Sequence, residues 1–303
     1  MVICIWNKCN SRCIMCTNPS DFWKSDIYTQ DFLEQRILGI GKKLKKNEEI
    51  LLTGGEPTIH PQFLEILNFT RKTYPNNQIE LLSNGRRFVY KEFAHKVMQM
   101  PNLTLMISLS GYDSKTHDKI TRSEGSFQQT IEGLKNIFFY FHPSLNQKVE
   151  IRIVITKINY KYLTKILDLI RKKFFLVDRV ILIFLEVEGQ GRDNFDQVGL
   201  TYKQFNPFLK DIYPYFTKLK ELRLYHFPLC TLPPKFWPHV WRTLPEEELD
   251  FLPTCKKCLY KQYCLGIHKE YLEVVGAKEF KPLNLKLKLK LSDNFHHPIL
   301  DIK

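Results

Sequence analysis

The sequence has no long hydrophobic run and is not rich in glycine or proline. Its longest apolar stretch, 180–185, is far shorter than the roughly 20 residues that a membrane-spanning helix needs. Only 13 Gly and 16 Pro occur in 303 residues, of which 44% are hydrophobic, so a collagen-like, coiled-coil or disordered chain is excluded. The N-terminal residues lack the charged and apolar regions of a signal peptide. We therefore expect a globular cytoplasmic protein that does not contact a membrane.

Acidic residues are few relative to basic ones. The chain has 32 Asp and Glu against 45 Lys and Arg, a formal net charge of +13. This excess favours anionic partners such as nucleic acid, phosphates or acidic peptides. The lysines are spread along predicted helices, as in GKKLKK, which is more typical of a solvated face than of a nucleic-acid site. RNA therefore remains an alternative partner.

Short apolar runs with strand character alternate with helical patterns up to about residue 220. The predicted strands are 2–6, 50–53, 78–83, 103–109, 149–155 and 179–187. The predicted helices are 29–45, 61–73, 90–100, 126–140, 162–174 and 202–220. Six strand–helix units imply parallel strands joined by helical crossovers, and apolar strands such as VILIFL are typical of a sheet covered on both faces. The pattern predicts an α/β fold.

The composition changes after Lys220, where Pro, Trp, Phe and Cys become dense and helical periodicity fades. We expect a core domain over 1–220, a small cysteine-rich cap over 221–285 and a basic tail over 286–303. The alternation LNLKLKLKL near the end predicts either an edge strand guarded by lysines or a basic tail.

Seven of the eight cysteines fall into two clusters. In a reducing compartment they are metal ligands more often than disulfides. Cys9, Cys13 and Cys16 form a C-x3-C-x2-C spacing just after the first predicted strand. Zinc sites prefer paired C-x2-C spacings and four ligands, whereas three thiolates can hold a [4Fe–4S] cluster and leave one iron open. Zinc with a distant fourth ligand, and thiols without a metal, remain alternatives.

The motifs CNSRC, GGEPT, SNGR and SLSGYD all follow predicted strands, so we expect them at the carboxyl-terminal rim of the sheet. CNSRCIMC and LTGGEPT resemble the cluster motif and the second-strand motif of the radical S-adenosylmethionine superfamily, and the resemblance runs from about residue 2 to about residue 190. It implies a partial (β/α)6 TIM-like barrel in which the open iron binds S-adenosylmethionine. Reduction by a flavodoxin- or ferredoxin-type donor would release a 5′-deoxyadenosyl radical that abstracts hydrogen from a substrate.

The resemblance also implies which residues contact S-adenosylmethionine. Gly54 and Gly55 allow close backbone approach and offer carbonyls to its ammonium group, and Glu56 adds a negative acceptor. The ends of the third, fourth and fifth strands contribute Ser83, Asn84, Ser108, Ser110 and Arg152, although the Asn-Gly pair of SNGR is also typical of a simple turn. Arg152 would pair with the methionyl carboxylate, although a salt bridge with Glu150 on the same strand face explains it equally well.

Other polar residues near these motifs have less defined roles. His117 and Asp118 are expected to orient the loop after the fourth strand, and Ser126 is a predicted N-cap of the next helix. Glu186 and Glu188 follow the sixth strand, where a substrate would lie. Either glutamate could contact substrate, and a structural role explains them equally well.

The second cysteine cluster combines Cys230 with Cys255, Cys258 and Cys264. Four thiolates make a closed site that suits zinc or an auxiliary iron–sulfur cluster. The pattern C-x2-C-x5-C-x-G resembles the auxiliary-cluster cap of many radical S-adenosylmethionine enzymes. This resemblance favours a [4Fe–4S] cluster over zinc.

Several stretches are similar to the C-type radical maturases of the His-Xaa-Ser repeat peptide system: CNSRCIMC, ILLTGGEPT, SNGRRF, FPLCTLPPKFWP and CKKC. The similarity implies modification of a ribosomally made peptide. The sequence departs from this group at SLSGYD and in the long C-terminal tail, which are substrate-side regions. RNA or a small metabolite is the alternative substrate. A non-catalytic metal-binding module is the alternative of another class, and it leaves GGEP and SNGR unexplained.

Overall fold

The computed structural model describes residues 1–19, 21–22, 28–41, 44–45 and 48–303. The chain divides into two compact units. The first unit comprises Met1–Cys13, Asn18–Arg152 and Asp168–Asp178. The second unit comprises Ile14–Thr17, Ile153–Leu167 and Arg179–Lys303. Among the described residues no helix is both long enough and apolar enough to cross a membrane.

Within the described part of the chain, eight strands form one sheet in the order in which they occur in the sequence. Those of the first unit are β1 (Val2–Trp6), β2 (Ile50–Gly54), β3 (Ile79–Ser83), β4 (Leu103–Ser108) and most of β5 (Lys148–Ile155). Those of the second are β6 (Arg179–Phe184), β7 (Leu222–Tyr225) and β8 (Val240–Trp241). Neighbouring strands within each unit pair in parallel. Among the described residues no pairing joins β1 to β8, and the prediction of an α/β fold with a partial TIM-like barrel is confirmed.

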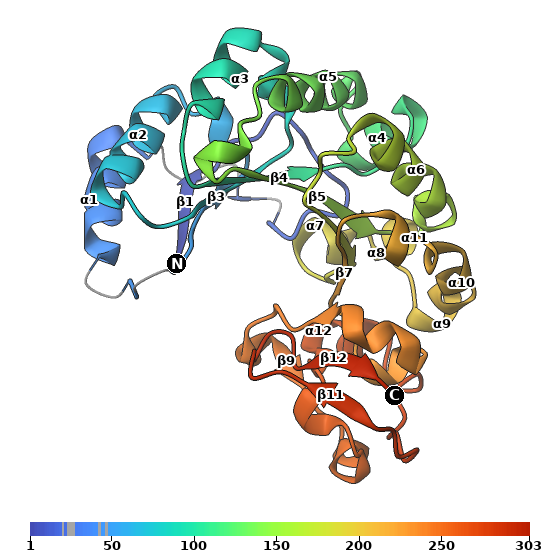
Figure 1. Cartoon of the computed structure of the whole chain (residues 1–303). Helices are drawn as coiled ribbons and strands as arrows, with labels where there is room; N and C mark the ends of the chain where they lie inside the picture. Colours follow the sequence, from blue (N-terminus) through green and yellow to red (C-terminus); the bar gives the residue numbers. More distant parts are fainter. Residues whose placement is uncertain (20, 23–27, 42–43, 46–47) are drawn as a thin grey trace. The chain divides into compact units, whose positions relative to one another are not determined.

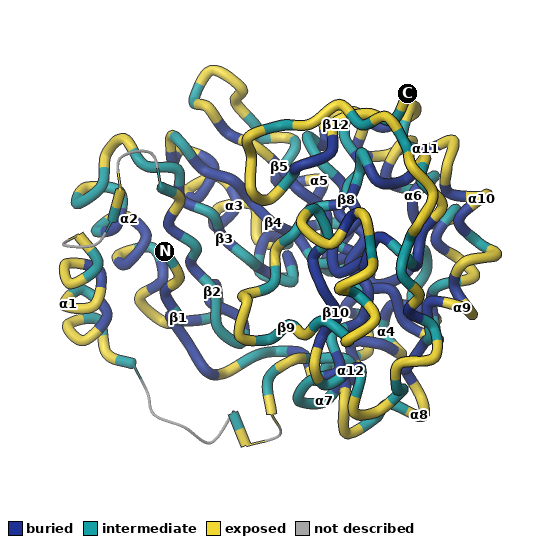
Figure 2. The backbone as a smooth tube through the Cα atoms, turned by 90° about the horizontal axis from the view of Figure 1, so that it is seen from below, coloured by how far each residue is buried: buried dark blue, intermediate teal, exposed yellow. Residues whose placement is uncertain are grey.

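Helices connect the strands, and in the first unit they lie along the outer side of the sheet (Figure 1). They are α1 (Gln30–Ile40), α2 (Phe63–Thr73), α3 (Lys91–Met98), α4 (Ser114–Thr121), α5 (Ser126–Phe139) and α6 (Leu163–Lys173), which spans both units. In α2 the buried residues are Phe63, Ile66, Leu67 and Thr70, a spacing that places them on one face. The strands β4 and β5 are buried along most of their length, whereas α1 alternates between buried and exposed residues (Figure 2).

The prediction of a single helix over 202–220 is wrong. The segment is broken into α9 (Tyr202–Phe205), a 3-10 turn over Asn206–Phe208, α10 (Leu209–Ile212) and α11 (Tyr215–Lys218). Pro207 and Pro214 lie at the breaks, and a proline cannot donate the backbone hydrogen bond that a continuous helix requires. Between β6 and α9 the chain also forms the short helices α7 (Gly189–Asp193) and α8 (Phe195–Val198), which the periodicity did not indicate.

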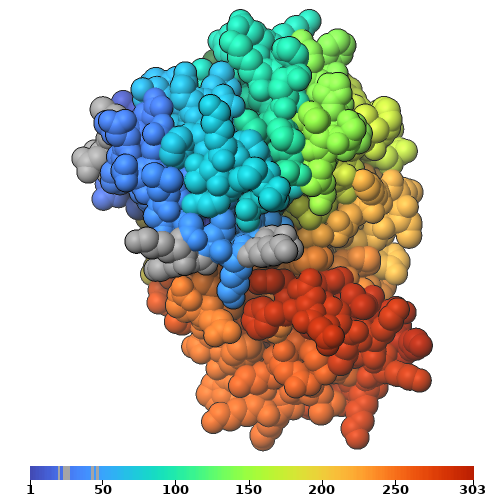
Figure 3. All heavy atoms as spheres, turned by 60° about the vertical axis from the view of Figure 1, so that its left-hand side comes forward, coloured from blue at the N-terminus to red at the C-terminus, as the bar shows by residue number. Residues whose placement is uncertain are grey.

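The C-terminal part of the second unit contains small antiparallel pairs. β9 (Leu249–Asp250) pairs with β10 (Ile267–His268), which α12 (Lys269–Val274) follows. β11 (Leu289–Leu291) pairs with β12 (Ile299–Ile302), so the lysine-rich stretch does form a strand at its end. On the face drawn in Figure 3, the last residues (red) lie against the orange segment that precedes them.

The start of α5 shows how a side chain fixes one of the crossovers. Gly125, with φ +73°, is the N-cap, so the prediction that Ser126 caps the helix is wrong. Asp118 instead accepts hydrogen bonds from the backbone N–H of Phe127 at 2.8 Å and of Gly125 at 2.9 Å. Its carboxylate also accepts the hydroxyl of Ser126 at 2.8 Å. Asp118 therefore supplies the cap from the preceding helix and orients the loop, as the sequence predicted.

We expect Asp118→Ala to loosen the first turn of α5, because the amide donors of Gly125 and Phe127 lose their acceptor. Loss of such a cap costs about 1 kcal/mol, which corresponds to several-fold faster local hydrogen exchange. Exchange mass spectrometry of a peptide spanning 119–130 measures this change. Asp113→Ala is the matched control, because Asp113 caps α4 through Thr116 and should loosen only that helix. Unchanged exchange at the start of α5 would contradict the assignment.

Candidate functional site

The first cysteine loop begins three residues after β1. Cys9 and Cys13 belong to the first unit and Cys16 to the second; all three are half-buried and form no disulfide. The Cys9 sulfur accepts the backbone N–H of Ser11 at 3.4 Å and lies 4.0 Å from the amide nitrogen of Asn84. N–H donors around a thiolate are typical of iron–sulfur ligands, whose reduction potential they help to set.

The SNGR turn after β3 holds the cysteine loop in place. The Asn84 amide donates to the Asn10 side chain at 2.7 Å. The Arg86 guanidinium donates to the Asn10 carbonyl and, at 3.0 Å, to the Ser11 hydroxyl. Its Nε donates to Gln129 on α5 at 2.6 Å. Arg86 is a positioning residue that the sequence analysis missed, although it is the last residue of a motif already selected.

Because Gly54 and Gly55 have no side chains, the turn after β2 packs closely against the backbone that joins β1 to the cysteine loop. Gly54 has φ +146°, and a Cβ there would lie 2.3 Å from the Trp6 carbonyl oxygen. A Cβ at Gly55 would lie 2.5 Å from the Lys8 carbonyl oxygen. The Gly55 N–H donates to the Trp6 carbonyl at 2.6 Å. No side chain fits at either position, so close backbone approach occurs here between two chain segments.

Glu56 is buried beneath these turns, with 1% of its surface exposed. One carboxylate oxygen accepts the hydroxyls of Thr58 at 2.5 Å and Ser83 at 2.8 Å, and the Thr58 N–H at 3.1 Å. The other oxygen accepts the Asn84 N–H at 2.7 Å. Burial raises the pKa of Glu56, and these hydrogen bonds oppose the rise. The carboxylate thus joins the end of β2 to the end of β3.

Ser108 and Ser110 lie at and just after the end of β4. Ser108 is half-buried and pairs in register with Arg152 on β5, whereas Ser110 is buried. The Arg152 Nε lies 2.6 Å from a Glu150 carboxylate oxygen, so the salt bridge weighed in the sequence analysis is formed. Burial lowers the pKa of His117 to about 4, so its neutral ring accepts the Ser110 N–H at 3.2 Å. Contact of Ser108, Ser110 or Arg152 with a cofactor stays a prediction.

The second cysteine group is brought together within the second unit. Cys230, Cys255, Cys258 and Cys264 line one hollow of about 20 Å³. Three chain segments meet there, and two of them donate backbone N–H groups to sulfur at 3.4 Å: Leu229 to Cys264, and Leu283 to Cys258.

Trp237 fixes the first of these segments. It is 1% exposed, and its indole N–H donates to the carbonyls of Leu229 at 3.1 Å and Leu232 at 3.2 Å. Its ring packs edge-on against Tyr260, which lies between the second and third cysteines of the other segment. Trp237 therefore helps to hold the segment of Cys230 beside the C-x2-C-x5-C segment.

The four thiols fit a multivalent metal centre. Burial, and next the neighbouring Cys264 thiol, raise the pKa of Cys230 to about 12. Burial also raises the pKa of Cys264. Four thiolates in one buried place repel each other unless cations lie among them, and N–H donors already face two of the sulfurs. This donor set suits either zinc or a [4Fe–4S] cluster.

Glu186 and Glu188 are both paired with histidines that the sequence analysis did not select. Glu186 lies 3.2 Å from His226 Nδ1, just after β7. Glu188 lies 2.9 Å from His268 Nε2, at the end of β10. Both partners are distant in sequence and neither belongs to a recognisable motif, so only the folded chain reveals them. Substrate contact by either glutamate stays a prediction.

A cavity of about 730 Å³ lies beside the second cysteine group, with Cys258 and Cys264 in its wall. Arg242 and Lys261, against one glutamate, Glu246, make its charged lining predominantly positive, and Phe251 and Phe295 add aromatic surface. The Arg242 guanidinium stacks on the Phe295 ring at 4.0 Å. The cavity therefore offers a cationic and aromatic surface next to two thiols.

The sequence profile of the radical SAM superfamily matches residues 3–183. This region includes the first cysteine loop, the turns described after β2, β3 and β4, and Arg152 on β5.

Over the residues that align, curated relatives are about a quarter identical to the chain. An AdoMet-dependent heme synthase from Methanosarcina barkeri is 25% identical over 196 residues, which is 63% of this chain and 51% of that protein. A probable GTP 3′,8-cyclase from Saccharolobus islandicus is 27% identical over 239 residues, which is 76% of this chain and 70% of that protein. The chain spans about half the length of the first of these relatives.

Solved structures share its fold at lower identity. Streptococcus suis SuiB, bound to the precursor peptide SuiA, has a TM-score of 0.55 at 18% identity over 73% of this chain and 47% of SuiB. Native anSMEcpe, bound to AdoMet and the Cp18Cys peptide, has a TM-score of 0.56 at 20% identity over 74% of this chain and 62% of that protein.

We expect Glu56→Gln to weaken the join between β2 and β3. A glutamine amide offers one acceptor and brings two donors, so its NH2 group would face the hydroxyl of Ser83 or the N–H of Asn84. A buried donor without an acceptor costs about 1–3 kcal/mol. Exchange mass spectrometry of residues 79–85 should show faster exchange by one order of magnitude or more. Glu65→Gln on the exposed face of α2 is the control and should leave this region unchanged. Equal exchange in both variants would contradict the anchoring role of Glu56.

Proposed function

The chain belongs to the radical SAM superfamily, and we propose that it uses S-adenosylmethionine to modify a ribosomally made peptide. When bound at a [4Fe–4S] cluster and reduced by one electron, S-adenosylmethionine supplies a 5′-deoxyadenosyl radical that abstracts hydrogen. The residues of this chain hold the cluster, seat the cofactor and orient the substrate. The observation that carries the proposal is the cysteine loop after β1, tied by hydrogen bonds to the turns after β2 and β3.

Cys9, Cys13 and Cys16 are the proposed ligands of the first cluster. Their half-buried positions suit a cofactor that must be reached by a small molecule on one side. Arg86 and Asn84 restrain the loop through Asn10, which reduces the conformational freedom that cluster binding would otherwise have to remove. The N–H of Ser11 donates to the Cys9 sulfur and would stabilise the thiolate.

The proposed binding site for S-adenosylmethionine, called the seat below, lies along the carboxyl ends of β2 to β5. The residues assigned to it are Gly54, Gly55, Glu56, Ser83, Asn84, Ser108, Ser110 and Arg152. Within this set Glu56 and Ser83 are buried and hydrogen-bonded to each other, so we propose that they position the turns rather than contact the cofactor. Arg152 shares its charge with Glu150, which leaves a net-neutral pair on the β5 side of the seat.

We propose that Cys230, Cys255, Cys258 and Cys264 hold an auxiliary [4Fe–4S] cluster, with zinc as the alternative. The shared hollow and the backbone donors to sulfur support a tetrathiolate centre. We place the cap that carries it over 221–285, after a core over 1–220 and before a tail over 286–303. The cytoplasm suits free thiols and a flavodoxin- or ferredoxin-type electron donor.

The peptide substrate is supported by two fold neighbours whose structures contain peptides, SuiB and anSMEcpe. A small metabolite is the second candidate, because the curated relatives act on GTP or make heme, according to their names. The cavity of about 730 Å³ beside the second cysteine group has room for a peptide side chain or for a compact metabolite. RNA is a further alternative that the charge of +13 permits.

The cofactor assignment predicts the metal content of the wild type and of the variants Cys13→Ala, Cys258→Ala and Cys4→Ala. After anaerobic reconstitution the wild type should contain about eight irons per chain and cleave S-adenosylmethionine to 5′-deoxyadenosine with dithionite. Cys13→Ala should contain about four irons and release no 5′-deoxyadenosine. Cys258→Ala should lose the second cluster but keep cofactor cleavage. Iron and sulfide analysis, together with liquid chromatography of 5′-deoxyadenosine, measures these values.

Cys4→Ala is the matched control, because Cys4 lies within β1, outside both cysteine motifs, and its thiol donates to the Asn7 side chain. It should behave as the wild type. About four irons and one zinc in the wild type would make the second centre structural. Full iron content and cleavage in Cys13→Ala, or none of either in the wild type, would contradict the proposed function.

The substrate is tested separately with the loaded enzyme. Candidate peptides encoded beside its gene, GTP and total RNA are each incubated with S-adenosylmethionine and dithionite. Mass spectrometry should find a product that has lost hydrogen, or gained a crosslink, only in a peptide. A modified nucleotide instead of a modified peptide would replace the peptide assignment with one of the alternatives.

A further inference from the structure

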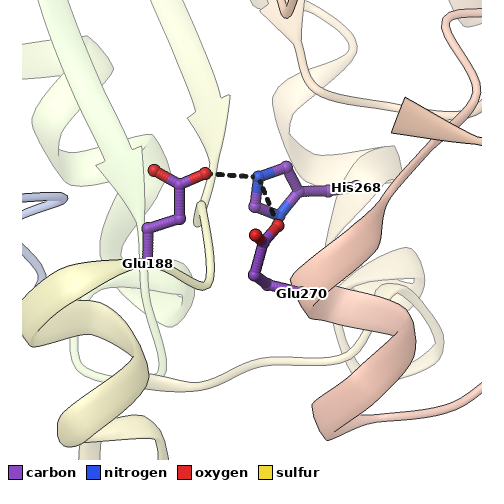
Figure 4. Close-up of side chains that lie close together, drawn as sticks. All are labelled: Glu188, His268 and Glu270. Atoms are coloured by element: carbon purple, nitrogen blue, oxygen red, sulfur yellow. Dashed lines mark hydrogen bonds and ion pairs between the residues drawn. The ribbon is translucent and has the colours of Figure 1, made fainter. Parts of the chain in front are cut away.

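A second group of metal-type ligands lies in the second unit, apart from the cysteines. Glu188 follows β6, His268 ends β10, and Glu270 lies in the first turn of α12. Their ligand atoms all lie within 4.8 Å of one another. Figure 4 shows both carboxylates directed toward the same imidazole ring.

The Nε2 atom of His268 lies close to two carboxylates but has at most one N–H to donate. It lies 2.9 Å from a Glu188 oxygen and 3.3 Å from Glu270 Oε2. One N–H donates well to one acceptor, and the bond to Glu188 uses it. In the part of the chain that the structure describes, Glu270 Oε2 is buried without a hydrogen-bond partner, and so is the other ring nitrogen, Nδ1. The His268 side chain itself is only 6% exposed.

The surroundings carry an excess of negative charge. Burial raises the pKa of Glu248. The charge of Glu188 raises it further, and the charge of Glu270 adds a smaller upward contribution. Burial lowers the pKa of His268, but its hydrogen bond to the Glu188 carboxylate and the charges of Glu188, Glu270 and Glu186 outweigh this effect, so the net shift is upward. Among the described residues, no lysine or arginine forms an ion pair with Glu188 or Glu270. Lys269, next in sequence, instead donates to the Glu247 carbonyl.

We propose that Glu188, His268 and Glu270 bind one divalent first-row transition-metal ion, of the Mn²⁺, Fe²⁺ or Zn²⁺ class. Ligands about 2.1 Å from such an ion lie about 3.0 Å apart at right angles and about 3.4 Å apart in a tetrahedron. The separations of 2.9 and 3.3 Å lie within the range of such edges, and all three ligand atoms lie within 4.8 Å of one another. The ion would contact the orphaned Glu270 oxygen and offset the carboxylate charge. Imidazole with two carboxylates is a donor set that these ions accept.

Such an ion would retain open coordination positions. Three protein ligands leave at least one place for water or for a substrate oxygen, as in sites where a metal acts on a bound molecule. The side chains of Glu188 and Glu270 are 30% and 29% exposed, so the site can be reached from solvent. It would also tie the segment after β6 to the start of α12. This inference does not depend on the identity of the substrate or on the occupancy of the cysteine groups.

The test uses Mn²⁺ as the probe, because it prefers carboxylate and imidazole ligands to thiolates and reports free ion by electron paramagnetic resonance. Full-length protein, reconstituted anaerobically and freed of loose metal, is titrated with MnCl2. We expect one Mn²⁺ per chain to lose its free-ion signal, and Zn²⁺ to displace it. Iron content is measured on the same samples, so failure of the cluster assignment is seen independently.

Glu188→Gln and Glu270→Gln each remove one anionic ligand while keeping side-chain volume. Each should weaken Mn²⁺ binding by at least about tenfold, because even changes beyond the ligands cost 10–100-fold in metal affinity. Glu273→Gln is the matched control: it lies on the same helix and pairs with Arg192 on the surface. It should bind Mn²⁺ as the wild type does. Circular dichroism and iron content establish that each variant is folded.

The proposal is overturned if the wild type binds no Mn²⁺ or Zn²⁺ beyond the weak level of a denatured sample. It is also overturned if folded Glu188→Gln and Glu270→Gln bind as tightly as Glu273→Gln. Either result would leave Glu188, His268 and Glu270 as a hydrogen-bonded group without an ion.

Discussion

The buried carboxylate of Glu56 is the interaction on which the first part of the candidate site depends. It receives hydroxyl and amide donors from both the turn after β2 and the turn after β3. Asn84, held by this carboxylate, reaches Asn10 in the cysteine loop. A charge buried at this depth is costly unless its hydrogen bonds are complete. The same bonds therefore fix the relative positions of the two turns and of the loop.

The second unit also places ionisable groups in buried positions. Four thiols surround one small hollow, and thiolates gathered in so small a space repel one another unless protons or cations lie among them. Two buried histidines, His226 after β7 and His268 at the end of β10, each lie against a glutamate that follows β6. Each pair sets an imidazole beside a carboxylate, which offsets the cost of burying the carboxylate charge.

The sequence predicted the parts of the fold that follow from local pattern. β1 spans the predicted residues, and the crossovers up to α6 occur where apolar periodicity indicated them. The helix predicted over 202–220 failed because periodicity gave too little weight to Pro207 and Pro214. β7 and β8 were not predicted, since strands as short as Val240–Trp241 depend on their neighbours in the sheet rather than on their own composition.

The candidate site, like the fold, could be predicted from the sequence only in part. Motif spacing identified the cysteines and the turns after β2 and β3. It could not reveal that Glu56 is enclosed by donors, that Arg86 holds the cysteine loop, or that His268 lies against Glu188 and Glu270. These contacts join residues far apart in the chain, and none of them leaves a local signature.

The most direct test of the central claim is electron paramagnetic resonance of the dithionite-reduced Cys258→Ala variant, in which only the first cluster is expected. Addition of S-adenosylmethionine labelled with ¹⁵N in its amino group should change the g-values of the [4Fe–4S]⁺ signal and introduce hyperfine coupling to the label. This result would place the cofactor on the cluster held by Cys9, Cys13 and Cys16. A cluster signal that does not respond to the cofactor, or the absence of a cluster signal, would contradict the account.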